Sequence, residues 1–186
     1  LDRIGYETRW QLVKAVEYGV PQFRPRYIMI GVNRRLMNGE QTESFFQLLA
    51  NTRREFLKKK GLLPNIKGKD YISTREAISD LEMQGRRLTE CADSPGFEQI
   101  IYEGPRTLYQ RIMHGSMNGV PPNSLRLPRH REKTIETFNN IMKYCRPGVS
   151  LSDEERAKVG LNKHCIVWLH PNNPSHTLTT LPDDLL

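Results

Sequence analysis

The sequence contains no long hydrophobic run. No stretch approaches the roughly 18 apolar residues that a membrane-spanning helix needs, so we expect no membrane partner. Cysteine is also scarce. Cys91, Cys145 and Cys165 are an odd number at unrelated spacings. This pattern argues against a disulfide framework and indicates a reducing compartment.

Metal-binding and nucleotide-binding signatures are missing as well. There is no Cys-x2-Cys pair, and the five histidines show no familiar ligand spacing, so the sequence predicts no metal site. Neither a G-x-G-x-x-G loop nor a P-loop is present, so no cofactor-binding residue is assigned in this segment. His164 and Cys165 leave two interpretations open, a Cys/His pair or a buried structural cysteine. We favour the second, because adjacent side chains of a strand point to opposite faces.

The sequence does have an excess of positive charge. It carries 28 Lys and Arg against 21 Asp and Glu over 186 residues, which gives a formal net charge of +7. An anionic partner such as a nucleic acid is consistent with this balance, although many soluble proteins are equally basic.

The most informative stretch begins at a turn over residues 19–21. Gln22, Arg24 and Arg26 follow at alternate positions, and residues 27–32 form a short apolar run typical of a buried strand. In an extended chain the three polar side chains would share a face. Two guanidiniums and an amide suit phosphate oxygens and a base edge. The alternative is a pair of solvated charges that protect an edge strand from aggregation.

This stretch, Tyr18-Gly-Val-Pro-Gln-x-Arg-x-Arg26 with a strand ending at Gly31, resembles the eighth signature motif of DNA (cytosine-5)-methyltransferases. Four further segments are similar to that family in the same order. They are Gly5-Tyr6 with Leu12-Val-Lys-Ala15 (the strand leading into the motif), Ser73 to Leu81 (opening of the target-recognition region), Leu125 to Lys133 (within it) and Pro174 to Thr180 (the ninth motif).

Other parts of the family pattern are absent. The glycine-rich cofactor loop, the Pro-Cys nucleophile, the Glu-Asn-Val segment and the closing Gly-Asn motif do not occur. The resemblance therefore implies the C-terminal part of a longer DNA (cytosine-5-)-methyltransferase. The missing part would bind S-adenosylmethionine, and this chain alone would be inactive.

The resemblance also implies roles for individual residues. Arg26 would hold the extruded cytosine and a neighbouring phosphate, Arg24 would support the active site, and Gln22 would fix the loop and contact DNA. A base must leave the duplex before its ring is attacked. A positive charge beside it stabilises the electron density that develops.

Basic clusters provide the remaining candidates. Those at residues 34–35, 53–60 and 126–133 are equally consistent with solvated helix faces. In the third, arginines alternate with other residues and could contact phosphates or base edges. A Thr-Leu pair near the end matches the family, although β-branched strand preference explains it equally well. The residues assigned to DNA binding here are Arg126, Arg129, Arg131, Lys133, Thr177 and Leu178.

The periodicity predicts short elements separated by loops. Capping pairs indicate helix starts at Ser44, Ser73 and Ser152, and residues 85–105 read mostly as loop. In the first of these helices, Phe45, Leu48, Leu49, Thr52 and Phe56 are expected on the inner face, and in the second Ala77, Ile78 and Leu81. The other expected elements are two strands within 1–35, helices over 106–114 and 130–144, and strands over 165–169 and 177–181.

We therefore predict an α/β fold: the end of a Rossmann-like methyltransferase sheet plus a small irregular α+β target-recognition domain. Residues 1–35 would end the catalytic domain, 36–173 would form the recognition domain, and 174–186 would return to the sheet. The expected partners are double-stranded DNA and a missing N-terminal catalytic half or subunit. The expected setting is a bacterial restriction-modification enzyme, cytoplasmic or nucleoid-associated. The alternatives are a non-enzymatic DNA-binding module and a basic domain unrelated to DNA.

Overall fold

A computed structural model describes residues 1–36, 40–62, 71–115, 117, 120–161 and 166–177. The chain divides into two compact units, 1–72 and 73–186, and each is described by itself. Over the described ranges, no helix is both long enough and apolar enough to cross a bilayer. The functional division expected after residue 35 stays a prediction, since the first compact unit extends to residue 72.

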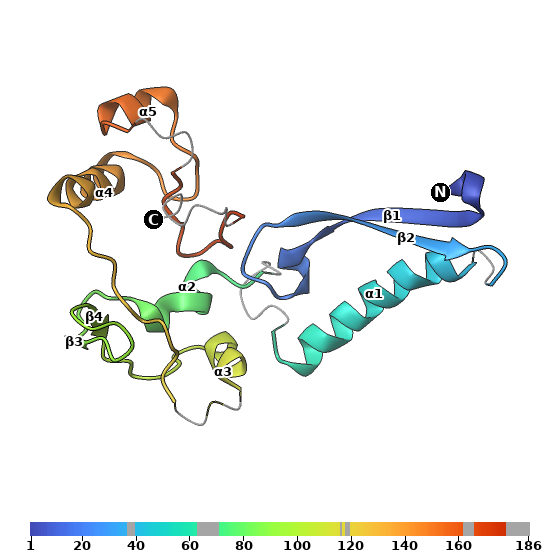
Figure 1. Ribbon diagram of the computed structural model, residues 1–186, viewed down its shortest axis with the longest axis horizontal. Helices are drawn as coiled ribbons and strands as arrows, with labels where there is room; N and C mark the ends of the chain where they lie inside the picture. Colours follow the sequence, from blue (N-terminus) through green and yellow to red (C-terminus); the bar gives the residue numbers. More distant parts are fainter. Residues whose placement is uncertain (37–39, 63–70, 116, 118–119, 162–165, 178–186) are drawn as a thin grey trace. The chain divides into compact units, whose positions relative to one another are not determined.

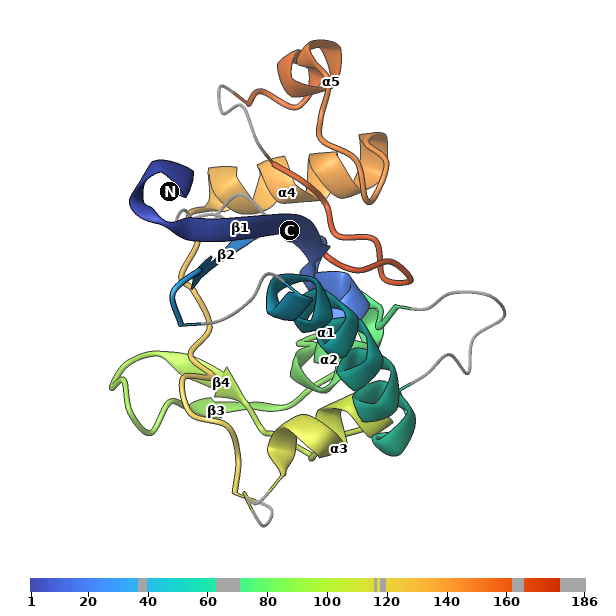
Figure 2. The same cartoon turned by 90° about the vertical axis from the view of Figure 1, so that its right-hand side faces the viewer.

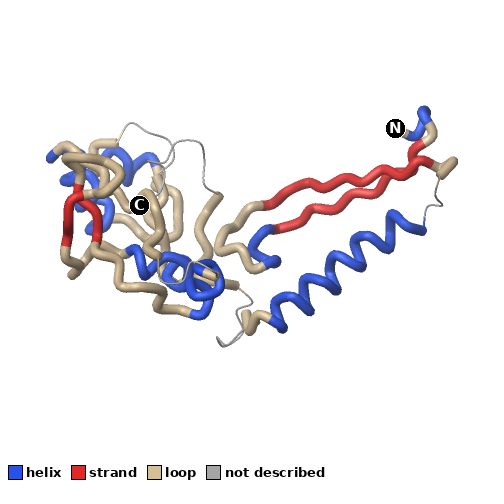
Figure 3. The backbone as a smooth tube through the Cα atoms, turned by 60° about the horizontal axis from the view of Figure 1, so that its bottom comes forward, coloured by secondary structure: helices blue, strands red, loops and turns tan. Residues whose placement is uncertain are grey.

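The first unit is built on an antiparallel hairpin of β1 (Tyr6–Lys14) and β2 (Pro25–Asn33). The short 3-10 helix η2 (Ala15–Tyr18) and a turn connect the strands, and η1 (Asp2–Ile4) precedes them. Helix α1 (Glu40–Lys59) runs along the hairpin and packs against both strands (Figures 1 and 3). The prediction of two strands around the turn is confirmed.

The hairpin has one partly covered face and one exposed apolar face. Half-buried Ile28 and Ile30 alternate with Tyr27 and Met29, which are exposed. The register pairs Trp10 with Met29 across the strands, and the Trp10 ring stacks on Tyr27 at a centroid distance of 5.3 Å. A two-stranded sheet alone is marginally stable, so α1 is needed to cover its other side.

Helix α1 differs from its prediction in both start and orientation. It begins at Glu40, so Ser44 lies inside the helix and does not cap it. Buried Thr42 and Leu57 mark the inner face, whereas much of the expected face is exposed. The helix has two adjacent apolar stripes, and the hairpin covers only one. The expected inner residues that are exposed are Phe45, Leu48, Thr52 and Phe56; Leu49 is half-buried.

The second unit consists of short helices and one small antiparallel hairpin (Figure 2). Capping boxes at Ser73 and Ser152 confirm two predicted helix starts. A third box at Thr107 starts the next helix two residues after its predicted start at 106. The elements are α2 (Thr74–Ile78), η3 (Ser79–Leu81), β3 (Leu88–Glu90), β4 (Glu98–Ile100), α3 (Leu108–His114), α4 (Glu132–Tyr144) and α5 (Asp153–Lys158).

A small core holds α4 and α5. Ile141 on α4 is fully buried, and Phe138 and Cys145 lie on the same side. The helix begins at Glu132, so the predicted bounds of about 130–144 are confirmed to within two residues. The other members of the cluster are Leu151, Val159, Leu161, Ile166 and Trp168.

Two local predictions for this unit are wrong, and a third is incomplete. Ile78 and Leu81 are exposed, and it is the carboxylate of Asp80 that is buried between them. Residues 85–105 are mostly loop, as predicted, but they also contain the short β3–β4 hairpin, which was not predicted. In place of a strand over 165–169, Val167 forms only an isolated bridge with Ser150. Cys165, His164 and residues 178–181 of the last predicted strand lie outside the described residues. The observed fold is mixed α/β with small sheets.

Candidate nucleic-acid interface

The hairpin entrance places the three polar residues of the turn in different environments. Gln22 is 9% exposed, Arg24 is half-buried, and Arg26, near the start of β2, is exposed. The Arg26 Nη1 donates to the backbone carbonyl of Pro25 at 2.7 Å. Among the described residues, neither guanidinium has a carboxylate partner. Both charges are therefore available to an anionic or carbonyl-bearing ligand.

The turn that leads to these residues is held against α1. Gly19 adopts a φ of +79°, and a Cβ there would lie 2.9 Å from Leu57 Cδ2. Arg53 on α1 pairs with Glu17 at 3.5 Å and stacks its guanidinium over the Tyr18 ring. One member of the second basic cluster therefore stabilises the turn. The positive φ of Gly19 and the close approach of Leu57 explain why this turn needs glycine.

In the second unit, two predicted DNA-binding arginines share one aromatic ring. The guanidinium carbons of Arg126 and Arg129 lie 5.0 and 4.5 Å from the centroid of the Phe97 ring. The ring is half-buried and both arginines are exposed. A cation–π contact of this kind uses the positive charge of the guanidinium and leaves its N–H donors able to form hydrogen bonds.

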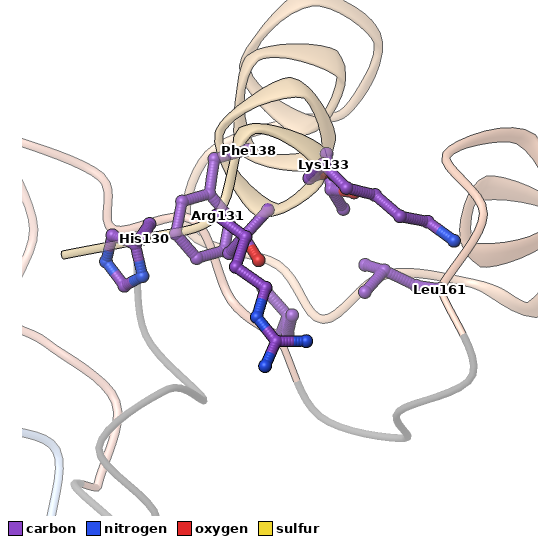
Figure 4. Close-up of a pocket in the computed structure, with 8 residues that line it drawn as sticks. His130, Arg131, Lys133, Phe138 and Leu161 are labelled. Carbon is purple, nitrogen blue, oxygen red and sulfur yellow. The ribbon is translucent and has the colours of Figure 1, made fainter.

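A cavity of about 460 Å³ lies at the start of α4 (Figure 4). His130, Arg131 and Lys133 form its polar side, while Phe138 and Leu161 contribute apolar surface. The His130 ring meets the Phe138 ring edge-on at 5.2 Å. Cationic side chains around an apolar floor suit an aromatic ring that carries a phosphate. The structure thus brings Arg131 and Lys133 together at one cavity, a few residues beyond Arg129.

A polar network centred on buried Asp80 connects η3 to the end of α3, and the sequence did not predict it. The Tyr102 hydroxyl donates to Asp80 Oδ2 at 2.7 Å and lies 2.6 Å from His114 Nε2. Burial, together with the hydrogen bond and charge of Asp80, raises the pKa of Tyr102 well above its ordinary value. The hydroxyl thus stays protonated and serves as a donor. No local pattern reveals such a network, because its members come from separate segments.

The last two predicted contacts lie at the end of the described chain. Thr177 is half-buried, and Leu178 lies outside the described residues. Near Thr177, His176 Nε2 lies 3.0 Å from the Gly148 carbonyl oxygen. The assignment of Thr177 and Leu178 to DNA therefore stays a prediction.

The described residues do not fit S-adenosylmethionine. The cavity at α4 is lined by Arg131 and Lys133, whose positive charges would repel the positive sulfonium group. Both described sheets are antiparallel hairpins, and neither offers the parallel strands whose carboxyl ends hold such cofactors in open α/β sheets. We therefore derive no methyl-transfer step at this chain's own residues.

These features define a mixed α/β protein with two arginines at a hairpin entrance and exposed arginines along a basic segment, residues 126–133. The sequence model of the family described as C-5 cytosine-specific DNA methylase matches residues 1–164. The chain belongs to this family, whose members use S-adenosylmethionine to methylate cytosine in DNA. No curated protein matches the chain. No solved structure matches it either.

Proposed function

We propose that this chain supplies the target-base grip and the DNA-recognition surface of a cytosine-5 DNA methyltransferase. The observation that carries the proposal is the turn at Gly19, packed on α1, which leads to two arginines without described carboxylate partners. In this assignment Arg26 holds the extruded cytosine and Arg24 supports the site. Gln22 fixes the loop from its buried position.

The nucleophile and the cofactor would come from another part of the enzyme. Cys91 is buried, and its thiol lies 2.9 Å from an Asp93 carboxylate oxygen. Burial, followed by the charge of Glu155, raises the pKa of the Cys145 thiol, which disfavours the reactive thiolate. Neither thiol follows a proline, unlike the family nucleophile.

The exposed apolar face of the hairpin supports a docking role for that other part. Trp10, Leu12 and Tyr27 are each more than half exposed, and Met29 is 50% exposed. Such contiguous apolar surface marks an interaction site more often than ordinary solvated surface. We assign it to the catalytic half, which would extend the two-stranded sheet or cover its bare face.

Reconstituted methyl transfer tests this function. The chain, joined or mixed with a catalytic part that carries the cofactor loop and the Pro-Cys nucleophile, should methylate duplex DNA. Arg26→Ala should lower turnover by about 10²-fold or more, as loss of a group that stabilises developing charge does, while DNA affinity falls far less. Arg9→Ala, on the same hairpin, serves as the control and should leave both unchanged. Equal turnover for Arg26→Ala and the unaltered chain would refute the assignment.

A second candidate is a DNA-binding module without enzymatic activity. The basic segment around Arg126 and Arg129 is compatible with it, because it needs no catalytic part. Salt-dependent DNA binding that persists while no catalytic part restores methylation would favour the module. If the chain shows no salt-dependent DNA binding, both candidates fail.

A further inference from the structure

The Phe97 ring holds two positive charges close together. Because both guanidinium carbons lie within 5.0 Å of its centroid, Arg126 and Arg129 are separated by less than the Debye length, about 10 Å at 0.1 M salt. Neither arginine has a carboxylate partner in the described part of the chain. Two positive charges therefore lie close together with no carboxylate paired to either of them in that part of the chain.

The backbone of the basic segment is held against β4 next to the Phe97 ring. Arg126 forms an isolated antiparallel bridge with Gln99, and the Leu127 N–H donates to the Glu98 carbonyl at 2.8 Å. The basic segment therefore lies as an additional edge beside β4. Its position does not depend on the arginine side chains, so it persists when they are altered.

A carboxylate connects the loop before Phe97 to the start of the basic segment. Asp93 accepts hydrogen bonds from the Cys91 thiol at 2.9 Å and the Ser94 hydroxyl at 3.1 Å, and the backbone of Ser124 lies close enough to help lower its pKa. Ser124 adopts a φ of 59°, in the left-handed region that non-glycine residues seldom occupy. A non-glycine residue keeps this backbone conformation only where the surrounding structure imposes it.

We propose that Phe97 is a positioning residue for DNA recognition, which presents Arg126 and Arg129 together to neighbouring acceptors on one stretch of duplex. The inference rests on the proposed function and adds the residue that organises the DNA contact. Phe97 itself need not touch DNA. Phe97 restricts the two long arginine side chains before DNA binds, so that they lose less conformational entropy on binding.

DNA fits this pair of cations better than an acidic protein surface does. Duplex DNA carries one negative charge per about 1.7 Å of helix axis, so two guanidiniums held within a Debye length meet several phosphates at once. Each guanidinium also keeps its planar donors for two hydrogen bonds to a phosphate or to a guanine edge. Carboxylates on a protein surface would pair with both guanidiniums only if their spacing matched that of the two arginines.

The test measures binding of a fluorescein-labelled mixed-sequence duplex to the 186-residue chain across a series of salt concentrations. Phe97→Leu keeps apolar bulk but removes the π face, and we expect about three- to tenfold weaker binding at each salt concentration. The salt slope should stay the same, because both charges remain. Phe97→Trp should bind as the unaltered chain does, since indole is the best cation–π acceptor.

The paired change Arg126→Ala with Arg129→Ala identifies the charges. It should weaken binding and reduce the slope of log affinity against log salt by about 2, since each phosphate contact contributes roughly 0.9. In that background, Phe97→Leu should have no further effect on affinity. This comparison also separates positioning from stability. If Phe97→Leu weakened binding only by destabilising the protein, it would still weaken binding when Arg126 and Arg129 are both alanine.

The control lies on the same unit. Tyr144 makes equivalent contacts with Lys143 and Lys158, at 5.1 and 4.7 Å, and Tyr144→Leu should leave DNA affinity unchanged. Normal binding by Phe97→Leu, or failure of Phe97→Trp to restore it, would overturn the positioning role while the proposed function survives. An absence of effect from the paired arginine change would also overturn it. If the unaltered chain shows no salt-dependent binding, the proposed function itself fails.

Discussion

Replacement of Gly19 by alanine should destabilise the first unit by two separable effects. At a φ of +79° an alanine pays about 1–2 kcal/mol for the left-handed conformation. The new Cβ would also lie 2.9 Å from Leu57 Cδ2, closer than real Cβ contacts allow. Leu57 is 6% exposed and cannot move freely, so overpacking adds about 1–3 kcal/mol. We expect a total loss of about 2–5 kcal/mol in the free energy of unfolding.

Gly5 offers a matched control for this change. Its φ is +84°, but nothing lies within 4 Å of an added Cβ, so Gly5→Ala should show the conformational cost alone. Urea unfolding gives both free energies, and hydrogen exchange in β1 and β2 would locate the loss in the first unit. Leu57→Ala should remove the excess cost of Gly19→Ala. Equal destabilisation by the two glycine substitutions would refute the steric argument.

Two further predictions concern hydrogen bonds in the second unit. Tyr102→Phe should lower the free energy of unfolding, measured in urea, by about 1–3 kcal/mol, because the carboxylate of Asp80, which is 4% exposed, loses a hydrogen-bond donor. The control Tyr109→Phe should change this free energy little. An equal loss for Tyr109→Phe would contradict the reasoning. Asp93→Asn should lower the thermal midpoint at neutral pH, because hydrogen bonds from Cys91 and Ser94 depress the pKa of Asp93. That difference should vanish as pH falls through the depressed pKa, below the unfolded value of about 3.9; a difference that grows on acidification would contradict it.

The sequence predicted those elements whose determinants are local. The capping boxes at Ser73 and Ser152 each depend on two residues within one turn, and both helices begin where expected. The turn after Tyr18 depends on glycine and proline, and it too was predicted. The residues that determine such features are close together in the sequence, so no long-range contact is needed to predict them.

The features that were missed depend on partners distant in the chain. The inner face of α1 is selected by the hairpin, because its apolar residues form two stripes and only one is covered. The β3–β4 hairpin is short, and its Ser94-Pro-Gly96 loop indicated a turn but not the flanking strands. Likewise, Phe97 lies far in sequence from Arg126 and Arg129, so no spacing rule connects them. Arginine periodicity located the candidate charges but not the ring that holds them.

The ion pairs of the described residues separate arginines that build the fold from those assigned to DNA. Arg53 pairs with Glu17 and braces the turn, and Arg86, whose side chain is 3% exposed, pairs with Glu103. A buried guanidinium needs such a partner, since an unpaired buried charge is strongly destabilising. Arg126 and Arg129 instead remain exposed and are held by an aromatic ring, which fixes position without neutralising charge. A cation held in this way keeps its affinity for an external anion, whereas one paired within the fold does not. For this reason the contact with Phe97, more than the net charge of +7, supports a nucleic-acid surface on this chain.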